Sequence, residues 1–352
     1  MLSTQAPVAT ASLPISVPAN PAALRPLHTL SCIVPCYNEA ENLEQLLPLL
    51  QAQLACLAEQ WEIILVDDGS SDATAQRMPQ WTQHAGVRGL QLSRNFGKEA
   101  ALTAGLQAAA GDVVVMLDAD LQHPLALLDT FVRHWRAGAD VVYAVREHRD
   151  GESWFKRIGA GWFYGMVNGG RFKVPANAGD FRLMDRSVVQ ALLALPERNR
   201  FMKGLYAWVG FEAVAVTYLP EERGHGHSHF NKWRLLRLAL DGLFAFTLWP
   251  LRTVIMVGFL LALAAFAYGA YLTAVYLLYG HTVNGWTTIV VSLMLFAGIQ
   301  LVSLGVVGEY VGRIYEETKR RPIFVVKRDL GVGLKHTTLP AQATHSGTRS
   351  EA

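Results

Sequence analysis

The chain has 352 residues, of which 51% are hydrophobic and only 17% are charged, whereas soluble globular proteins average about 25% charged residues. The deficit is concentrated in residues 253–308 and 1–24, which contain no Asp, Glu, Lys or Arg. This distribution argues against a wholly soluble protein and against a transporter with many spans, and it predicts a soluble domain joined to a membrane segment. The net charge of +2 gives no sign of nucleic-acid binding.

Both ends of the chain have the composition of disordered segments. Residues 1–28 are rich in Ala, Pro, Ser and Thr, and their prolines exclude a long helix. No basic cluster precedes an apolar core, so we expect a disordered leader rather than a cleaved signal peptide. The polar stretch from about residue 338 is also predicted to be disordered. The three cysteines, Cys32, Cys36 and Cys56, are an odd number without metal-like spacing. A disulfide framework is therefore not expected, and a reducing compartment is favoured.

Residues 29–230 are predicted to form the soluble domain, in which short apolar runs alternate with helical patterns. This alternation is typical of an α/β domain with a mostly parallel sheet, and such sheets bind ligands beyond the carboxyl ends of their strands. In chain order, strands are expected at 30–34, 61–66, 89–92, 113–117 and 140–144, and helices at 39–57, from 70, at 97–110 and after Pro124.

Two apolar stretches, residues 253–279 and 287–308, each exceed the roughly 20 residues that span a bilayer. A buried helical hairpin of a soluble core is the alternative, although soluble helices rarely lack charge over such lengths. Basic residues flank the pair of stretches, while the short linker between them has none. We therefore expect a two-span hairpin in the cytoplasmic membrane over residues 251–310, with the soluble domain, both termini and a basic tail (311–352) in the cytosol.

Residues 231–250 combine large apolar side chains at helical spacing with interspersed charges. This pattern is typical of an amphipathic helix that lies at the membrane surface. A helix packed on the soluble domain would look similar, but a membrane span follows directly, which favours the interfacial location.

Carboxylates follow two of the expected strands. Asp67 and Asp68, with Gly69 to allow a turn, are well placed to accept hydrogen bonds from a base or ribose, although Asp-Gly is also a common structural turn. Asp118 and Asp120 follow a continuous apolar strand, and the usual partner of such a pair is a divalent ion that bridges phosphates. Capping of the next helix would explain Asp120 but not Asp118.

Two later segments carry further polar side chains. Asp180 and Arg182, in a Gly-flanked loop, suit a base and an anion clamp, or equally a salt-bridged surface turn. Residues 222–229 hold three alternating His, but extended alternation alone does not give metal-coordination geometry. A Gly-rich basic loop before an interfacial helix is better suited to bind phosphate.

Four ordered motifs resemble glycosyltransferase family 2, namely Ile33–Glu39, Val66–Asp72, Arg94–Lys98 and Asp118–Pro124. The two apolar stretches that follow resemble the polyprenyl-phosphate branch of this family, which includes dolichol-phosphate mannose synthase and the bactoprenol glucosyltransferases. The resemblance covers about residues 29–325. It implies a GT-A fold, which is a Rossmann-like α/β catalytic domain with a mostly parallel sheet, and inverting transfer from a nucleotide sugar.

The resemblance also implies roles for individual residues. Asp180 would be the candidate base. Arg223 and Ser228 match a loop that binds the lipid phosphate, His229 stands where the family often has Lys, and Lys232 would substitute for it. A metal, Mg²⁺ or Mn²⁺, would be held by Asp118, Asp120 and Gln122. Nucleotide-sugar contacts would come from Pro35, Tyr37, Glu39, Asp67, Asp68, Lys98 and Asp118.

We predict that the chain moves a sugar from UDP-glucose or another UDP-hexose to undecaprenyl phosphate in the membrane, for cell-envelope glycan modification. A phosphate monoester is already mostly dianionic at pH 7, so Asp180 either accepts a proton or orients the acceptor. The alternatives are a polyprenyl-phosphate mannose synthase that uses GDP-mannose, a processive polysaccharide synthase, and a non-catalytic scaffold that keeps the sugar-nucleotide fold. The processive synthase would need more spans. The sequence leaves open the sugar and whether the hairpins pack into a homo-oligomer.

Overall fold

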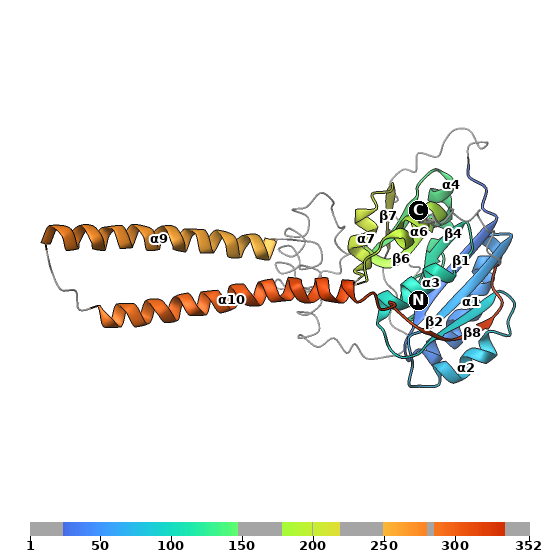
Figure 1. Ribbon diagram of the computed structural model, residues 1–352. Coiled ribbons are helices and arrows are strands. Elements are labelled where there is room, and N and C mark those ends of the chain that lie inside the picture. Colours follow the sequence, from blue (N-terminus) through green and yellow to red (C-terminus); the bar gives the residue numbers. More distant parts are fainter. Residues whose placement is uncertain (1–23, 147–177, 199, 219–248, 280–284, 335–352) are drawn as a thin grey trace, which may run out of the picture.

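The computed structural model describes residues 24–146, 178–198, 200–218, 249–279 and 285–334 (Figure 1). Most of the expected leader, interfacial helix and disordered tail lies outside these residues. The loop at 222–229 lies wholly outside them, so the predicted lipid-phosphate contacts Arg223, Ser228 and Lys232 stay predictions.

An eight-stranded sheet forms the centre of the soluble domain, in the order β7-β5-β6-β4-β1-β2-β3-β8. β4, β1, β2 and β3 are mutually parallel, whereas β6 and β8 are antiparallel to their neighbours. β4 reads Val-Val-Val-Met and is buried along its whole length, as expected for a strand covered on both faces. The strands are β1 (Thr29–Cys36), β2 (Gln60–Asp67), β3 (Val87–Leu92), β4 (Val113–Met116), β5 (Val141–Arg146), β6 (Ala178–Asp185), β7 (Ala213–Tyr218) and β8 (Val326–Gly331).

Helices cover both faces of this sheet. α1, α2 and α4 contribute to one cluster of buried apolar side chains, and α3, α6 and α7 contribute to a second cluster. Parallel strands need such crossover helices, and the resulting three layers confirm the expected α/β fold. The helices are α1 (Ala40–Leu57), α2 (Thr74–Trp81), α3 (Lys98–Ala108), α4 (Leu127–Arg136), α6 (Arg186–Ala194) and α7 (Met202–Trp208).

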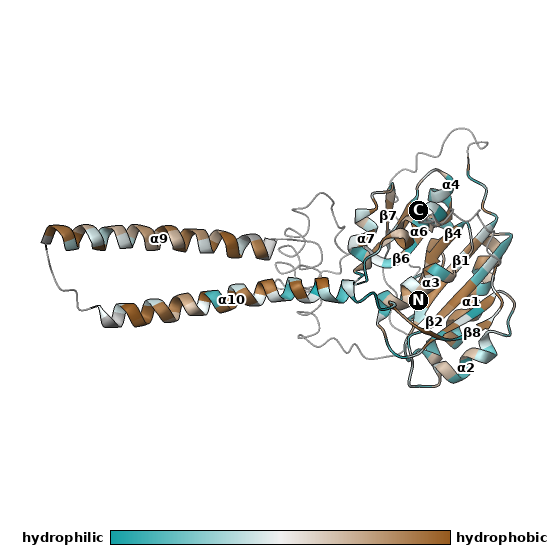
Figure 2. Ribbon diagram, in the orientation of Figure 1, coloured by the Kyte–Doolittle hydropathy of each residue, from teal (hydrophilic) through white to brown (hydrophobic). Residues whose placement is uncertain are grey.

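Two long helices, α9 (Trp249–Tyr279) and α10 (Trp286–Thr318), project from the domain (Figure 1). Within them, Thr253–Leu278 and Thr288–Thr318 are long and apolar enough to cross a bilayer, and neither is buried inside the protein. Figure 2 shows apolar residues along α9 and most of α10, while the end of α10 nearest the domain becomes hydrophilic. This exposure contradicts the alternative of a buried soluble hairpin and supports membrane association.

The chain returns to the sheet after α10. Residues 311–334 of the expected basic tail contain the end of α10, which continues to Thr318, and β8, which pairs with β3 at the sheet edge. Arg88 on β3 donates to both carboxylate oxygens of Asp329, at 3.0 and 2.7 Å. The chain after α10 therefore belongs to the same domain as the strands that precede the hairpin.

The last residues of the expected leader are ordered. Leu27 is buried in the core, and the guanidinium of Arg25 lies 3.4 Å from Asp140 and 3.7 Å from Asp185. The domain therefore begins before residue 29, because a short segment ahead of β1 packs against it.

Candidate active site

A pocket of about 310 Å³ lies beyond the carboxyl ends of β1, β2 and β4, where parallel sheets bind ligands. The loops that follow these strands form its walls, together with the N-terminal end of α3. The lining residues are Pro35, Cys36, Tyr37, Glu39, Asp68, Asn95, Gly97, Lys98, Ala101, Asp118, Ala119 and Asp120.

Asp68 holds the loop before α3 in place. Its two carboxylate oxygens accept hydrogen bonds from the backbone N–H groups of Phe96 (2.7 Å) and Gly97 (2.9 Å). Burial raises the pKa of Asp68, and these two hydrogen bonds oppose the shift. The adjacent Gly69 has a φ of +70°, and a Cβ there would lie 2.5 Å from the backbone of Arg94. Only glycine fits this turn without strain.

Asn38 joins the loop after β1 to the turn after β2. It has a φ of +58°, and its side-chain oxygen accepts a hydrogen bond from the backbone N–H of Ser71 at 2.8 Å. Asp67 is buried and accepts a hydrogen bond from the backbone N–H of Ser70 at 2.9 Å. Asp67 therefore shapes the turn and does not line the pocket. Tyr37, the residue before Asn38, does line the pocket and is 47% exposed.

Lys98, the first residue of α3, joins a carboxylate in the loop after β4 to one on β6. Its Nζ lies 2.7 Å from Oδ1 of Asp118 and 2.7 Å from Oδ2 of Asp180. Burial alone would lower the pKa of Lys98, but these two carboxylates outweigh it and raise the pKa. For the carboxyl of Asp118, burial alone would raise the pKa, but His123 and Lys98 hold the pKa of Asp118 well below its usual range. Lys98 and Asp118 therefore stay charged at neutral pH.

His123 supports Asp118 from a second direction. Its Nε2 lies 3.7 Å from Oδ2 of Asp118, and its Nδ1 lies 2.9 Å from the hydroxyl of Tyr218 at the end of β7. The imidazole packs against the ring of Phe181 at a centroid distance of 4.8 Å. His123 therefore links β6 and β7 to the acidic loop after β4.

The expected Gly-flanked loop at Asp180 and Arg182 is wrong, because both residues lie on β6 between β4 and β5. Arg182 is only 4% exposed. Its guanidinium lies 3.4 Å from the centroid of the Tyr206 ring and donates to the carbonyl of Gly179 at 2.8 Å. Since it does not line the pocket, Arg182 supports the strand that carries Asp180 and is not placed as an open anion clamp.

The predicted metal ligands are partly brought together. Asp118 and Asp120 line the pocket with Glu39, whose pKa is raised by burial and by the negative charge of both aspartates. Carboxylate oxygens that lie close together and carry negative charge are suitable ligands for Mg²⁺ or Mn²⁺. Gln122 is engaged elsewhere, because Arg146 donates to its Oε1 at 2.8 Å. Among the described residues, no group of three or more His, Cys, Asp or Glu is arranged to hold a metal.

Glu99 is a titratable group that lies just outside the motif Arg94–Lys98. Its Oε2 accepts a hydrogen bond from the backbone N–H of Met202, at the start of α7, at 3.2 Å. Burial, followed by the nearby charge of Asp180, raises the pKa of Glu99 to about 7. Burial and Asp180 thus outweigh the hydrogen bond from Met202, which lowers the pKa of Glu99.

Some of the expected site residues line the pocket and others do not. Asn95 and Gly97 also line it although they were not assigned roles, and the motif Arg94–Lys98 was the signal that could have found them. The expected residues that do not line it are Asp67, Gln122, Asp180 and Arg182, and those that do are Pro35, Tyr37, Glu39, Asp68, Lys98, Asp118 and Asp120.

Comparison with known proteins agrees with this geometry. Residues 31–193 match the family described as Glycosyl transferase family 2. The chain is 45% identical over 301 residues to an uncharacterized glycosyltransferase of Synechocystis sp., which covers 84% of this chain and 94% of that protein. It is 40% identical to the prophage bactoprenol glucosyl transferase homolog of Escherichia coli and to the bactoprenol glucosyl transferase of Shigella phage SfV, over 85% of this chain and 98% of each relative. The chain therefore belongs to glycosyl transferase family 2 and is a glycosyltransferase.

Proposed function

We propose that the chain transfers glucose from UDP-glucose to the phosphate of a membrane polyprenyl lipid, with inversion at the anomeric carbon. The observation that carries this proposal is the 40% identity to proteins named bactoprenol glucosyl transferase. The similarity covers 85% of the chain, which is too large a share to leave out either the pocket or the hairpin.

In this proposal the pocket holds the donor. The nucleoside lies against Pro35 and Tyr37, whose exposed ring is available for stacking, while Glu39 accepts hydrogen bonds from the ribose. Asp68 acts mainly by holding the loop at 96–97 close to the ligand. Lys98 keeps a positive charge next to the donor's phosphates, and its two carboxylate partners hold it in position.

Asp118 and Asp120 are proposed to hold Mg²⁺ or Mn²⁺, with Gln122 joining them once it releases Arg146. When bound, the ion neutralises the charge of the departing diphosphate. Transfer that continues undiminished in excess chelator would contradict this assignment.

The acceptor phosphate supplies the nucleophile. One of its oxygens bonds to the anomeric carbon while the bond from that carbon to the diphosphate breaks. Because a phosphate monoester is mostly dianionic at pH 7, no proton has to be removed. Asp180 is paired with Lys98, so we assign it to orienting the acceptor. Arg223, Ser228 and Lys232 are proposed to bind the lipid phosphate, with the catalytic domain on the cytosolic side of the membrane.

Membranes that contain the full chain test the proposal when they are given labelled UDP-glucose and undecaprenyl phosphate. We expect label in the organic-extractable lipid. The doubly substituted chain with Asp118→Asn and Asp120→Asn should lose it and serves as the matched control.

Other outcomes would replace the proposal. Lipid label from GDP-mannose alone would make the chain a mannose synthase. Label in a polymer would favour a processive synthase. No label from any nucleotide sugar, with the hairpin inserted, would favour a non-catalytic scaffold.

A further inference from the structure

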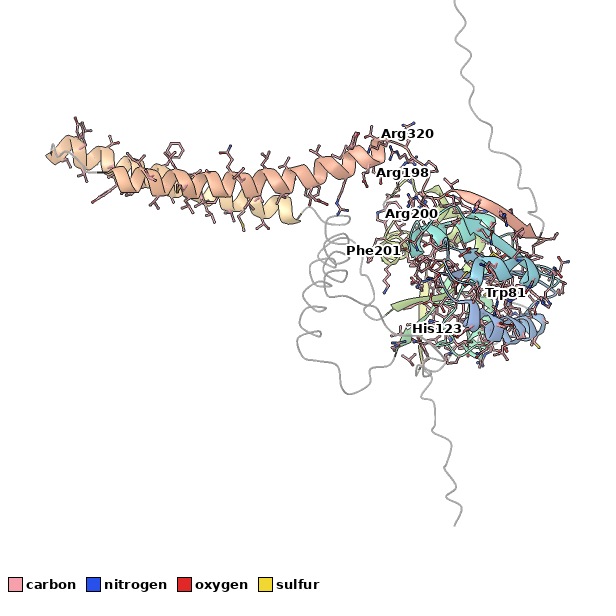
Figure 3. All side chains as sticks on the ribbon, turned by 90° about the horizontal axis from the view of Figure 1, so that it is seen from below. Trp81, His123, Arg198, Arg200, Phe201 and Arg320 are labelled. Atoms are coloured by element: carbon pink, nitrogen blue, oxygen red, sulfur yellow. The ribbon has the colours of Figure 1, made fainter. Side chains whose placement is uncertain are left out.

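The loop before α7 is attached to the end of α10. The backbone N–H of Arg198 donates to Oε1 of Glu317 at 2.9 Å, and the Arg198 guanidinium donates to the carbonyl of Arg321. Figure 3 shows Arg198 and Arg320 together where α10 meets the domain, with Phe201 close by. Figure 1 places α7 on the side of the domain nearest the helical hairpin. The membrane-proximal face of the domain is therefore the face that carries α7.

This face lies close to the lipid headgroups. About 20 residues of helix cross the roughly 30 Å hydrocarbon core, so a span that starts at Thr288 ends near Gly308. The first charged residue after that point is Glu309. Glu317 follows about 14 Å further along the helix, and the headgroup layer itself is about 5 to 8 Å thick. Arg198 therefore lies within about one Debye length of the headgroups at physiological salt.

The side chains on this face suit a bilayer surface. Trp208 on α7 is 55% exposed, while Met202 and Leu205 of the same helix are buried. Tryptophan concentrates at the membrane–water interface because its ring is apolar and its N–H is polar. Lys203 on α7 is half-buried. The exposed cations at the end of α10 are Lys319, Arg320 and Arg321, and the exposed acidic residues nearest in sequence to the two segments are Glu212, Glu309 and Glu316.

We propose that Lys203 and Trp208 of α7, with Lys319–Arg321 after α10, form a docking surface for the anionic phospholipids of the bilayer that holds the hairpin. Each cation near an anionic membrane surface contributes about fivefold in binding. In the described structure the Trp208 side chain is exposed to water. On docking, its ring enters the membrane interface and loses this contact with water. Docking fixes the height and tilt of the catalytic domain above the membrane. The inference depends on the hairpin spanning a bilayer and not on which sugar is transferred.

Spin-label accessibility tests the docking surface in the full chain. A nitroxide is attached at Trp208→Cys in a Cys56→Ser background, since Cys32 and Cys36 are buried. The control site is Leu49→Cys on α1, which is 56% exposed. In vesicles of phosphatidylglycerol and phosphatidylcholine, we expect the ratio of oxygen to nickel-complex collision to be several-fold higher at position 208 than at position 49. A label at Ala207→Cys should follow position 208.

Removing the negative charge of the lipid, or reversing the positive charge of the protein surface, should undo the protection of position 208 from the nickel complex. In vesicles of phosphatidylcholine alone, or with Lys203→Glu and Arg320→Glu together, the ratio at position 208 should fall to that of position 49. A label at position 208 that is open to nickel in both lipids would overturn the proposal, and so would one shielded from both reagents, because another part of the chain would then cover α7.

A label at Phe266→Cys on α9 checks insertion of the hairpin into the bilayer, and exposure of this label to nickel would overturn the premise that the hairpin spans the bilayer. None of these measurements requires turnover, so they can fail while glucosyl transfer is intact.

Discussion

Lys98 controls the charge balance of the site at the scale of single residues. If it is replaced by Met, Asp118 and Asp180 lose the cation that lies 2.7 Å from each of them. We expect Lys98→Met to lower kcat by about 10²-fold, as is typical when one preorganised electrostatic partner is removed. Lys98→Arg keeps the charge and should retain part of the activity. Steady-state kinetics with labelled donor measures both, and a Met variant within about threefold of the parent would contradict the assigned role.

Glu99 should make stability depend on pH. Its folded-state pKa is raised from the usual 4.5 to about 7, so the folded protein binds this proton more tightly than the unfolded chain does. Its stabilising contribution is present below about pH 4.5 and is lost as the pH rises through about 7. Glu99→Gln should therefore raise Tm relative to the parent most strongly above pH 7. Melting curves between pH 5 and 8 measure this difference, and a difference that does not change with pH would contradict it.

The sequence motifs located most pocket residues but not the contacts that set their properties. Tyr37, Glu39 and Asp118 follow strands whose apolar runs could be recognised locally. The role of Asp68 depends on backbone N–H groups of Phe96 and Gly97, 28 and 29 residues further along. No local pattern contains such partners, because tertiary packing brings them together.

At the scale of secondary-structure elements, the edge strand β8 should stabilise the domain although it is largely exposed. A chain that ends at residue 322 lacks the partner of β3, and buried Glu62 loses the hydrogen bond from the backbone N–H of Leu334. Lost hydrogen bonds cost about 1 kcal/mol each, and a buried group left without its partner costs about 1–3 kcal/mol. We expect Tm to fall by roughly 10 °C.

A chain that ends at residue 334 is the matched control for this truncation. It keeps β8 and the contact to Glu62, so its Tm in detergent should equal that of the full chain. Equal Tm values for the chains that end at 322 and 334 would show that β8 does not stabilise the domain.

Some strands of the sheet are easier to predict from sequence than others. The parallel strands β1, β2 and β4 are apolar runs, because they are buried on both faces, and they were predicted. β6 alternates polar Asp180 and Arg182 with buried Phe181 and Leu183, but its flanking glycine favoured a loop. β8 has Lys, Arg and Asp at its centre, as edge strands do, and its ion pair with β3 joins residues 241 positions apart.

The whole molecule has a topology that labelling in intact cells can measure. In the proposed topology the catalytic domain is cytosolic and the far end of the hairpin lies outside the cell, so Gly285→Cys, introduced with Cys56→Ser, should react with a membrane-impermeant maleimide. Native Cys56 is exposed on the catalytic domain and should react only after lysis. Cys32 and Cys36 should stay silent, since both are buried and burial raises the pKa of their thiols. The opposite labelling pattern would place the catalytic domain outside the cell.

The position of β8 after the hairpin also imposes an order on biosynthesis. In the part of the chain that the structure describes, seven strands of the sheet are made before both apolar helices, and the eighth strand is made after them. The catalytic domain therefore cannot complete its sheet until the hairpin has left the ribosome. Maturation of the enzyme is thereby tied to the same step at which the chain is committed to the membrane.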